Sequence, residues 1–129
     1  MFIVLGFYKR RPDLTHEQFS HHWRNVHGPL MQRIARTHPY MIRYVQHHLS
    51  PDSDYPVPAG ATSDTTTQVY DGFSEAWFEN KESRDKWFAL PVFKTEGAED
   101  ARQFLDMNTS RWAVIDEQHV IIPGPGASL

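Results

Sequence analysis

Four histidines lie in or beside the first predicted helix, and the last of them, His27, is placed where an imidazole can transfer protons. It follows Phe19 and Trp23 along an apolar helix stripe and directly precedes Gly28-Pro29, where we expect the helix to end or bend. A histidine at a helix end beside an apolar cavity can have a pKa near neutrality and act as a general acid or base. The alternative is a core histidine that holds the bend through a hydrogen bond to a backbone carbonyl.

The other histidines of this helix, His16, His21 and His22, fit a solvated helix face better than a metal site. His22 and His27 are five residues apart, so they do not share one face at the i, i+4 spacing, and no His-Glu-x-x-His motif is present. We therefore expect no dedicated metal site.

Cofactor signatures are also absent from the sequence. It contains no glycine-rich phosphate loop, no dinucleotide-binding fingerprint and no Gly-x-Ser-x-Gly elbow. With no cysteine, it also lacks disulfides, thiolate catalysis and cysteine-ligated haem or iron–sulfur groups. The economical interpretation is a reaction carried by side chains alone, with no cofactor.

The second predicted strand places Tyr44, Gln46 and His48 on one face. A phenol, an amide and an imidazole turned toward a covered cavity must be satisfied by a ligand, by water or by one another. We take Tyr44 and His48, with His27, as candidate catalytic residues. The alternative is that this face is in contact with solvent.

The third predicted strand carries small residues on one face and charged residues on the other. Gly72, Ser74 and Ala76 leave room for a ligand or a neighbouring backbone. On the opposite face, Asp71 or Glu75 could act as a base or orient a histidine, or each could pair with an arginine.

Aromatic side chains from several elements are expected to line the cavity, although spacing alone does not separate cavity-facing rings from rings that pack on helices. The aromatic candidates are Phe7, Trp23, Phe73, Trp77 and Phe78. For substrate binding we select Trp23, Gln46, Phe7, Glu75 and Phe78.

These residues are distributed over four predicted strands and three helical segments. Thr15 and Gln18 form a capping-box pattern at the start of the first helix, and Asn80 is a suitable N-cap for the second. We expect strands at 2–9, 40–48, 68–79 and 111–120, and helices at 15–37 with an interruption at 28–29, at 81–89 and at 97–107.

The order βαββαβ predicts an α+β, ferredoxin-like fold in which an antiparallel four-stranded sheet has helices on one face. The uncovered face carries apolar and aromatic residues, so a second copy of the chain could cover it. Two sheets facing each other would form a barrel, and we therefore expect a homodimer.

Length and composition indicate one globular domain at 1–122, with a long loop at 50–67 and a tail at 123–129. The 129 residues include 13 Lys and Arg against 16 Asp and Glu, a formal charge of -3 that suggests no nucleic-acid partner. The longest apolar stretch, Met1 to Tyr8, is too short to span a membrane. We expect a cytoplasmic protein with no membrane partner.

The segment from Leu14 to Leu30, Leu-Thr-His-Glu-Gln-Phe-Ser-His-His-Trp-Arg-Asn-Val-His-Gly-Pro-Leu, resembles the signature of EthD-domain proteins. The matching positions are Thr15, Glu17, Phe19, Trp23, His27, Pro29 and Leu30. The later Glu-Ala-Trp-Phe at 75–78, followed by a helix, is similar to the third strand and second helix of the same family.

This resemblance implies the dimeric α+β barrel fold. The superfamily includes cofactor-independent lyases, isomerases, cyclases and monooxygenases that act on polyketides and aromatic-degradation intermediates. The relatives of most interest are small polyketide decarboxylases and muconolactone methylisomerases. In the methylisomerases, a histidine at the position of His27 and a tyrosine matching Tyr44 lie in the active site. Their third-strand cysteine falls at Ala76 here, which argues against methylisomerase activity itself.

From this resemblance and these residues we expect a cofactor-independent lyase, a decarboxylase of an aromatic or polyketide-derived acid. His27 would deliver a proton to the carbon that loses CO2, while Tyr44 and His48 hold the oxygen where charge develops. One alternative is a cofactor-free monooxygenase or an isomerase of an aromatic intermediate. Another is a non-catalytic accessory protein that binds a hydrophobic intermediate.

Overall fold

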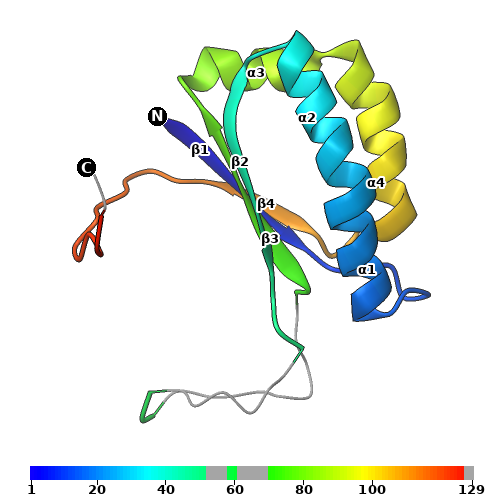
Figure 1. Cartoon of the computed structure of the whole chain (residues 1–129), viewed down its shortest axis with the longest axis horizontal. Helices are drawn as coiled ribbons and strands as arrows, with labels where there is room; N and C mark the ends of the chain where they lie inside the picture. The colour runs from blue at the N-terminus through cyan, green and yellow to red at the C-terminus, as the bar shows by residue number, and fades with distance from the viewer. Residues whose placement is uncertain (52–57, 61–69, 127–129) are drawn as a thin grey trace.

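The computed structural model describes residues 1–51, 58–60 and 70–126, and their main feature is a four-stranded sheet with helices on one side (Figure 1). The strands are β1 Phe2–Tyr8, β2 Met41–His48, β3 Gly72–Phe78 and β4 Arg111–Val114. They lie in the order β2-β3-β1-β4, and every neighbouring pair is antiparallel. The predicted ferredoxin-like fold is therefore confirmed.

The first helical segment runs without a break through the predicted interruption. It consists of α1 His16–His22, the π-helical turn η1 Trp23–His27 and α2 Gly28–Thr37. The Gly28 amide donates to the Trp23 carbonyl, an i to i−5 bond, and Pro29, which has no amide to donate, follows in the first turn of α2. A π turn therefore replaces the predicted end or bend. The capping box at the start of α1 is present as predicted.

The second helical segment lies between β3 and β4. Asn80 accepts from the Ser83 amide at 2.8 Å and caps α3 Lys81–Ala89, as predicted. A second π turn, η2 Phe93–Gly97, then leads into α4 Ala98–Phe104. The predicted helix 97–107 is wrong at its end, because Leu105 already pairs with Arg10 in an isolated β-bridge. Among the described helices, none has the length and apolar character that crossing a membrane requires.

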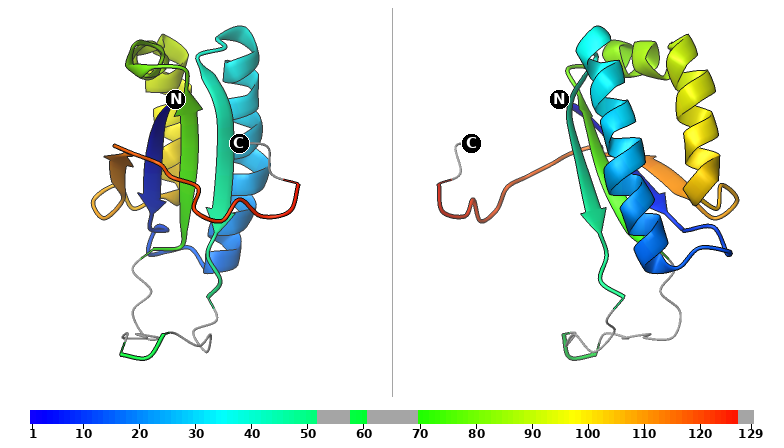
Figure 2. Two further views of the ribbon diagram at one scale, coloured as in Figure 1. Left: turned by 90° about the vertical axis from the view of Figure 1, so that its left-hand side faces the viewer. Right: turned by 45° about the vertical axis from the view of Figure 1, so that its right-hand side comes forward.

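The helices form one layer against the sheet. In Figures 1 and 2, α2 and α4 run side by side along it. Their apolar residues pack against one side of the strands, and fully buried rings such as Trp23, Trp87 and Phe78 lie between the layers.

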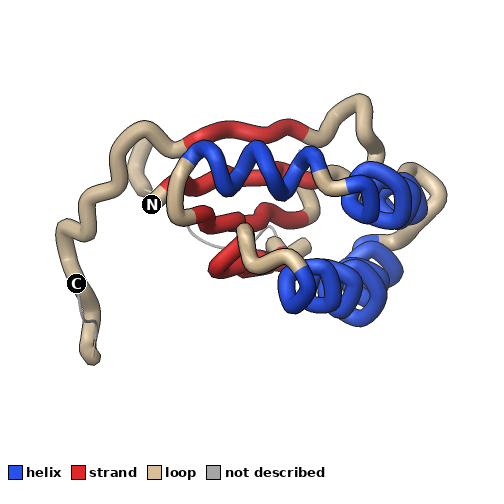
Figure 3. Tube along the Cα trace, turned by 90° about the horizontal axis from the view of Figure 1, so that it is seen from above, coloured by secondary structure: helices blue, strands red, loops and turns tan. Residues whose placement is uncertain are grey.

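Two predicted strands are longer than the observed ones. The strand predicted at 111–120 ends at Val114, because Val4 pairs with Val114 and β1 runs out two residues later. The chain after β4 leads away from the sheet on the side opposite the helices, and Ile121 and Ile122 are exposed there (Figure 3). The strand predicted at 68–79 begins only at Gly72. Residues 68–69 and most of the loop 50–67 lie outside the described residues.

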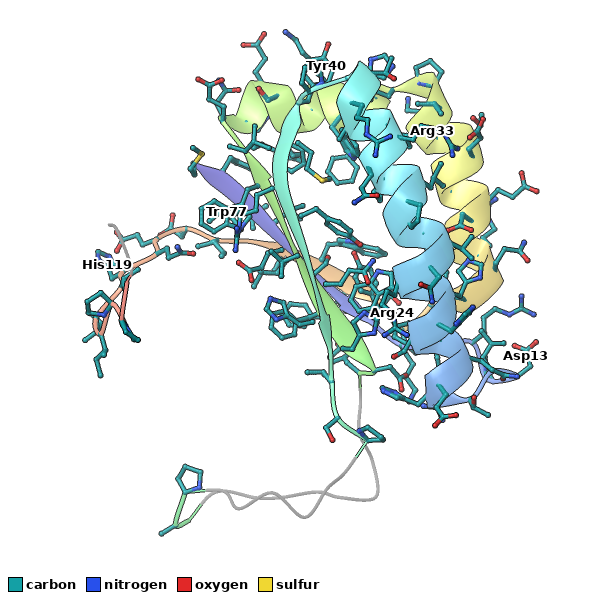
Figure 4. All side chains as sticks on the ribbon, viewed as in Figure 1. Asp13, Arg24, Arg33, Tyr40, Trp77 and His119 are labelled. Atoms are coloured by element: carbon teal, nitrogen blue, oxygen red, sulfur yellow. The ribbon has the colours of Figure 1, made fainter. Side chains whose placement is uncertain are left out.

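Because side chains alternate along each strand, the sheet has two distinct faces. We call the side against the helices the helix face and the other side the open face. In Figure 4, Trp77 points away from the helices, onto the open face. Strand pairing places further apolar side chains beside it, namely Ile3, Leu5, Phe7, Val45 and Phe73.

Candidate active site

A cavity of about 220 Å³ lies between the helix face and the helices. Most of its wall is apolar, and among the described lining residues there is no Lys, Arg, Asp or Glu. A charged ligand group would therefore meet no opposite charge on the wall itself. The polar side chains that line the cavity are Tyr8, Trp23, His27, Tyr44, Ser74, Trp87 and Trp112.

His27 lies at the end of η1 with one ring nitrogen turned to a carboxylate. Its Nδ1 is 2.8 Å from Oδ2 of Asp100 on α4. Because an ionised carboxylate only accepts, Nδ1 carries the proton, and Nε2 of the neutral ring has a free lone pair. Burial lowers the pKa of His27, and the adjacent Asp100 opposes this shift. Near pH 7 the ring is therefore a neutral base with a fixed tautomer.

The π turn explains why two histidines five residues apart meet the same carboxylate. His22 Nε2 is 2.9 Å from Asp100 Oδ1, while His27 binds the other oxygen. An α-helix would separate positions i and i+5 by about 140° around its axis, whereas the wider π turn reduces that rotation. The expectation that His22 lies on a solvated face away from His27 is therefore wrong.

Tyr44 lies on the helix face of β2 and lines the cavity, as the strand pattern predicts. Its hydroxyl oxygen accepts from Trp23 Nε1 at 3.0 Å, and the side chain of Gln46 also hydrogen-bonds the phenol. Burial, together with the neighbouring Tyr8, raises the pKa of Tyr44. The phenol therefore stays protonated at neutral pH and is a hydrogen-bond donor.

A second phenol, Tyr8 of β1, lines the same cavity. Its hydroxyl is 2.9 Å from Ser74 Oγ, and burial raises the pKa of Tyr8. The ring lies over Gly6, where a Cβ would overlap the Tyr8 hydroxyl and come within 2.9 Å of Ser74 Oγ. Glycine at this position therefore makes room for the phenol.

His48 and Gln46 do not line the cavity. His48 Nδ1 is 2.9 Å from Ser20 Oγ, and its Nε2 is 2.9 Å from Gln46 Oε1. The His48 ring packs on Trp23 with centroids 4.6 Å apart, and Gln46 donates to the Trp23 carbonyl at 2.8 Å. Both side chains hold Trp23, which lines the cavity, and Gln46 also hydrogen-bonds Tyr44, so they act on the site through these two residues.

The remaining substrate-binding candidates lie elsewhere. Phe7 is on the open face and packs against Tyr70 and Phe73. Glu75 is on the same open face, where its carboxylate lies 2.6 Å from His47 Nε2. The helix-facing Phe78 is fully buried in the core and is not part of the cavity lining. Of the candidate binding residues, the structure brings only Trp23 into the cavity wall beside His27 and Tyr44.

Two side chains of this site, Asp100 and Tyr8, are not among the sequence candidates. Alternation along β1 could have found Tyr8, because it shares a face with Gly6 and Val4. No sequence signal pairs Asp100 with His27, because the contact depends on where α4 packs against η1. Within the described part of the chain, no group of three or more His, Cys, Asp or Glu side chains is arranged to hold a metal ion.

The chain was compared with protein-family models, with curated proteins and with solved structures. The EthD domain model matches residues 11–108, which include His27, Tyr44 and Asp100. No curated protein matches the chain significantly.

Three solved structures illustrate the fold similarity. An ethyl tert-butyl ether d (EthD) family protein from Bacillus halodurans has a TM-score of 0.61 and 19% identity, covering 92% of this chain and 99% of that chain. A dimeric ferredoxin-like protein of unknown function from Jannaschia has a TM-score of 0.60 and 9% identity, with coverages of 90% and 98%. A mutant of SnoaB, a cofactor-independent oxygenase from Streptomyces nogalater, has a TM-score of 0.52 and 11% identity, with coverages of 93% and 94%. At these identities the likeness shows the fold alone.

Proposed function

Because this chain belongs to the EthD domain family, we propose that it is a cofactor-independent lyase that decarboxylates an aromatic or polyketide-derived acid. One observation carries the proposal: a neutral histidine, oriented by a carboxylate, lines an apolar cavity that also holds two protonated phenols. This set supplies a proton-transfer group together with donors for a developing oxyanion.

The apolar wall favours loss of a carboxylate. A substrate anion enters a cavity whose described lining has no cation, so it loses hydration without gaining an ion pair. Its negative charge raises the pKa of His27, and a proton is taken up with the ligand. Binding itself therefore converts His27 from a neutral base into an acid.

The chemical step consumes one proton, which His27 donates, and releases one CO2. The Nε2 proton of His27 moves to the ring carbon that bears the carboxylate, and a carbon–hydrogen bond forms. The bond to the carboxylate breaks, its electron pair returns to the ring, and CO2 leaves. Where a carbonyl group lies β to the carboxylate, its oxygen gains negative charge as the bond to CO2 breaks, and Tyr44 and Tyr8 donate hydrogen bonds to it. The solvent then returns the proton to His27.

The test is CO2 release from a panel of hydroxylated aromatic and polycyclic acids by the purified protein. With a substrate found, the variant His27→Gln should turn over about 10²- to 10⁴-fold more slowly, the range typical of a lost general acid. The matched control is His21→Gln, because His21 is exposed on the same helix and contacts Asn25 rather than Asp100. A folded His27→Gln variant with full activity would rule out the assigned role.

A second candidate is a cofactor-free monooxygenase, and SnoaB, a cofactor-independent oxygenase of the same fold, favours it. Here neutral His27 would remove a proton from a dihydroxyaromatic compound, and the resulting carbanion would reduce O2. One oxygen atom would stay in the product and the other would leave as water. Oxygen uptake with quinols, without CO2 release, would select this reaction. An accessory binding protein would instead bind its ligand without releasing CO2 or consuming O2. Substitutions of His27 or Tyr44 would then not change its function.

We also propose a homodimer in which a second copy covers the open face. The apolar residues of this face support it, as does the description of the Jannaschia protein as dimeric. Sedimentation velocity at micromolar concentration tests it, and a purely monomeric chain would contradict it.

A further inference from the structure

The carboxylate that orients His27 is shared with a second imidazole, which the proposed reaction does not use. Asp100 Oδ2 is 2.8 Å from His27 Nδ1, and Asp100 Oδ1 is 2.9 Å from His22 Nε2. Both rings also pack on Phe104, with centroid distances of 4.8 Å for His22 and 5.2 Å for His27. The two histidines are thus held in one cluster by a carboxylate and a ring of α4.

The two rings meet different surroundings. The side chain of His22 is 23% exposed and borders a surface groove lined mainly by α1, with Gln103 of α4, whereas that of His27 is 13% exposed and lines the cavity. Asp100 lies between them with its side chain 13% exposed. The cluster therefore connects the proposed site to the surface of the protein.

The single negative charge of Asp100 limits how many protons the two histidines can bind together. With one histidine protonated, the imidazolium and the Asp100 carboxylate neutralise each other. With both protonated, the second cation has no carboxylate of its own and is close to the first, in a partly buried place. The other titratable groups that line the cavity beside His27 are the phenols of Tyr8 and Tyr44, which carry no charge at neutral pH. Arg24, two residues after His22, is a cation that lines the same groove.

We propose that His22 is a positioning residue that competes with His27 for the Asp100 carboxylate and so sets the pH at which His27 takes up its proton. This inference rests on the proposed function, in which His27 carries the transferred proton. In the free protein, His22 holds His27 in the neutral form over a wider pH range than Asp100 alone would allow.

The experiment follows the imidazole resonances of His27 by NMR while the pH is changed, and it requires no substrate. Two variants separate the possible roles of His22. His22→Phe keeps a ring against Phe104 but removes the hydrogen bond and the charge. His22→Gln keeps an N–H donor to Asp100 but cannot be protonated. In His22→Gln the midpoint of His27 should rise because a like charge is gone, and in His22→Phe it should rise further, by about one pH unit, because the competitor for Asp100 is gone as well. The control His21→Gln should leave the midpoint in place.

A His27 midpoint that stays within roughly 0.2 pH units of the wild-type value in His22→Gln would overturn the inference, since a lost charge must shift a coupled neighbour. This outcome leaves the proposed function untouched if His27→Gln still slows turnover by about 10²- to 10⁴-fold. Conversely, a shifted midpoint in a protein that releases no CO2 supports the role of His22 and counts against the decarboxylase. With a substrate, the acid limb of the pH-rate profile should move in the same direction as the midpoint.

Discussion

Replacing Asp100 with asparagine tests the orientation of His27 most directly. The variant keeps the size of the side chain but removes its charge and presents one oxygen and one NH2 group to the two histidines. Loss of a charge-assisted hydrogen bond costs about 1.5–3 kcal/mol, which corresponds to a roughly 10- to 150-fold slower turnover. Where the NH2 group faces His27, it also favours the tautomer with the proton on Nε2, and the loss would then be larger.

The same variant has a readout that needs no substrate. Asp100 opposes the effect of burial on His27, so Asp100→Asn should lower the pKa of His27 further below its ordinary value. The measurement is the NMR titration of the His27 ring, with circular dichroism to confirm the fold. Glu99→Gln is the matched control, because Glu99 precedes Asp100 on α4 and is exposed. A His27 midpoint that stays in place or rises in Asp100→Asn would refute the assignment of the carboxylate.

Three further predictions concern stability and assembly. Gly6→Ala should lower the free energy of unfolding by about 1–3 kcal/mol, because the new methyl group overlaps the Tyr8 hydroxyl; urea denaturation measures this, and an unchanged midpoint would contradict the packing described. Burial lowers the pKa of both His27 and His48 in the folded protein. The stability that the two neutral rings contribute is therefore present above the pKa of an unfolded histidine, near 6.5, and is lost as the pH falls toward 5. Urea titrations at pH 7 and 5 should show that the free energy of unfolding falls less in His27→Gln than in wild type. Phe73→Asp places a carboxylate on the open face and should weaken self-association by about 30-fold or more, or ~2 kcal/mol, which sedimentation equilibrium would detect as monomer.

The fold could be predicted almost entirely from local patterns. Capping residues such as Thr15 and Asn80 mark where helices begin, and alternation along the strands separates the two faces of the sheet. The errors lie where a partner element decides the outcome. β4 ends at Val114, where only Ile3 and Phe2 of its neighbour β1 remain beyond the last pair, and nothing in the segment 115–120 itself shows this.

The site was only partly predictable for the same reason. The helix and strand positions of His27 and Tyr44 make them candidates but leave a core histidine and a solvent-facing strand open, and the resemblance to the EthD family supplies their roles. His48 shares the face of Tyr44, but the Trp23 ring lies against it, and the cavity wall is formed by Trp23 instead. Asp100 comes from a helix more than seventy residues away in sequence, and its contact with His27 depends on packing that no local pattern encodes.

The π turn at Trp23–His27 makes the site depend on the number of residues in the helix as well as on their identity. An i to i−5 bond accommodates one residue more than an α-helical turn does. Deleting the exposed Asn25 would restore ordinary α-helical spacing and leave His22 and His27 four residues apart, about 40° around an α-helix, so both could still face Asp100. Without the π turn, the present spacing of five residues would separate the two rings by about 140°, although both histidines would still be present. The shared carboxylate therefore depends on a helix that absorbs one extra residue between the two histidines.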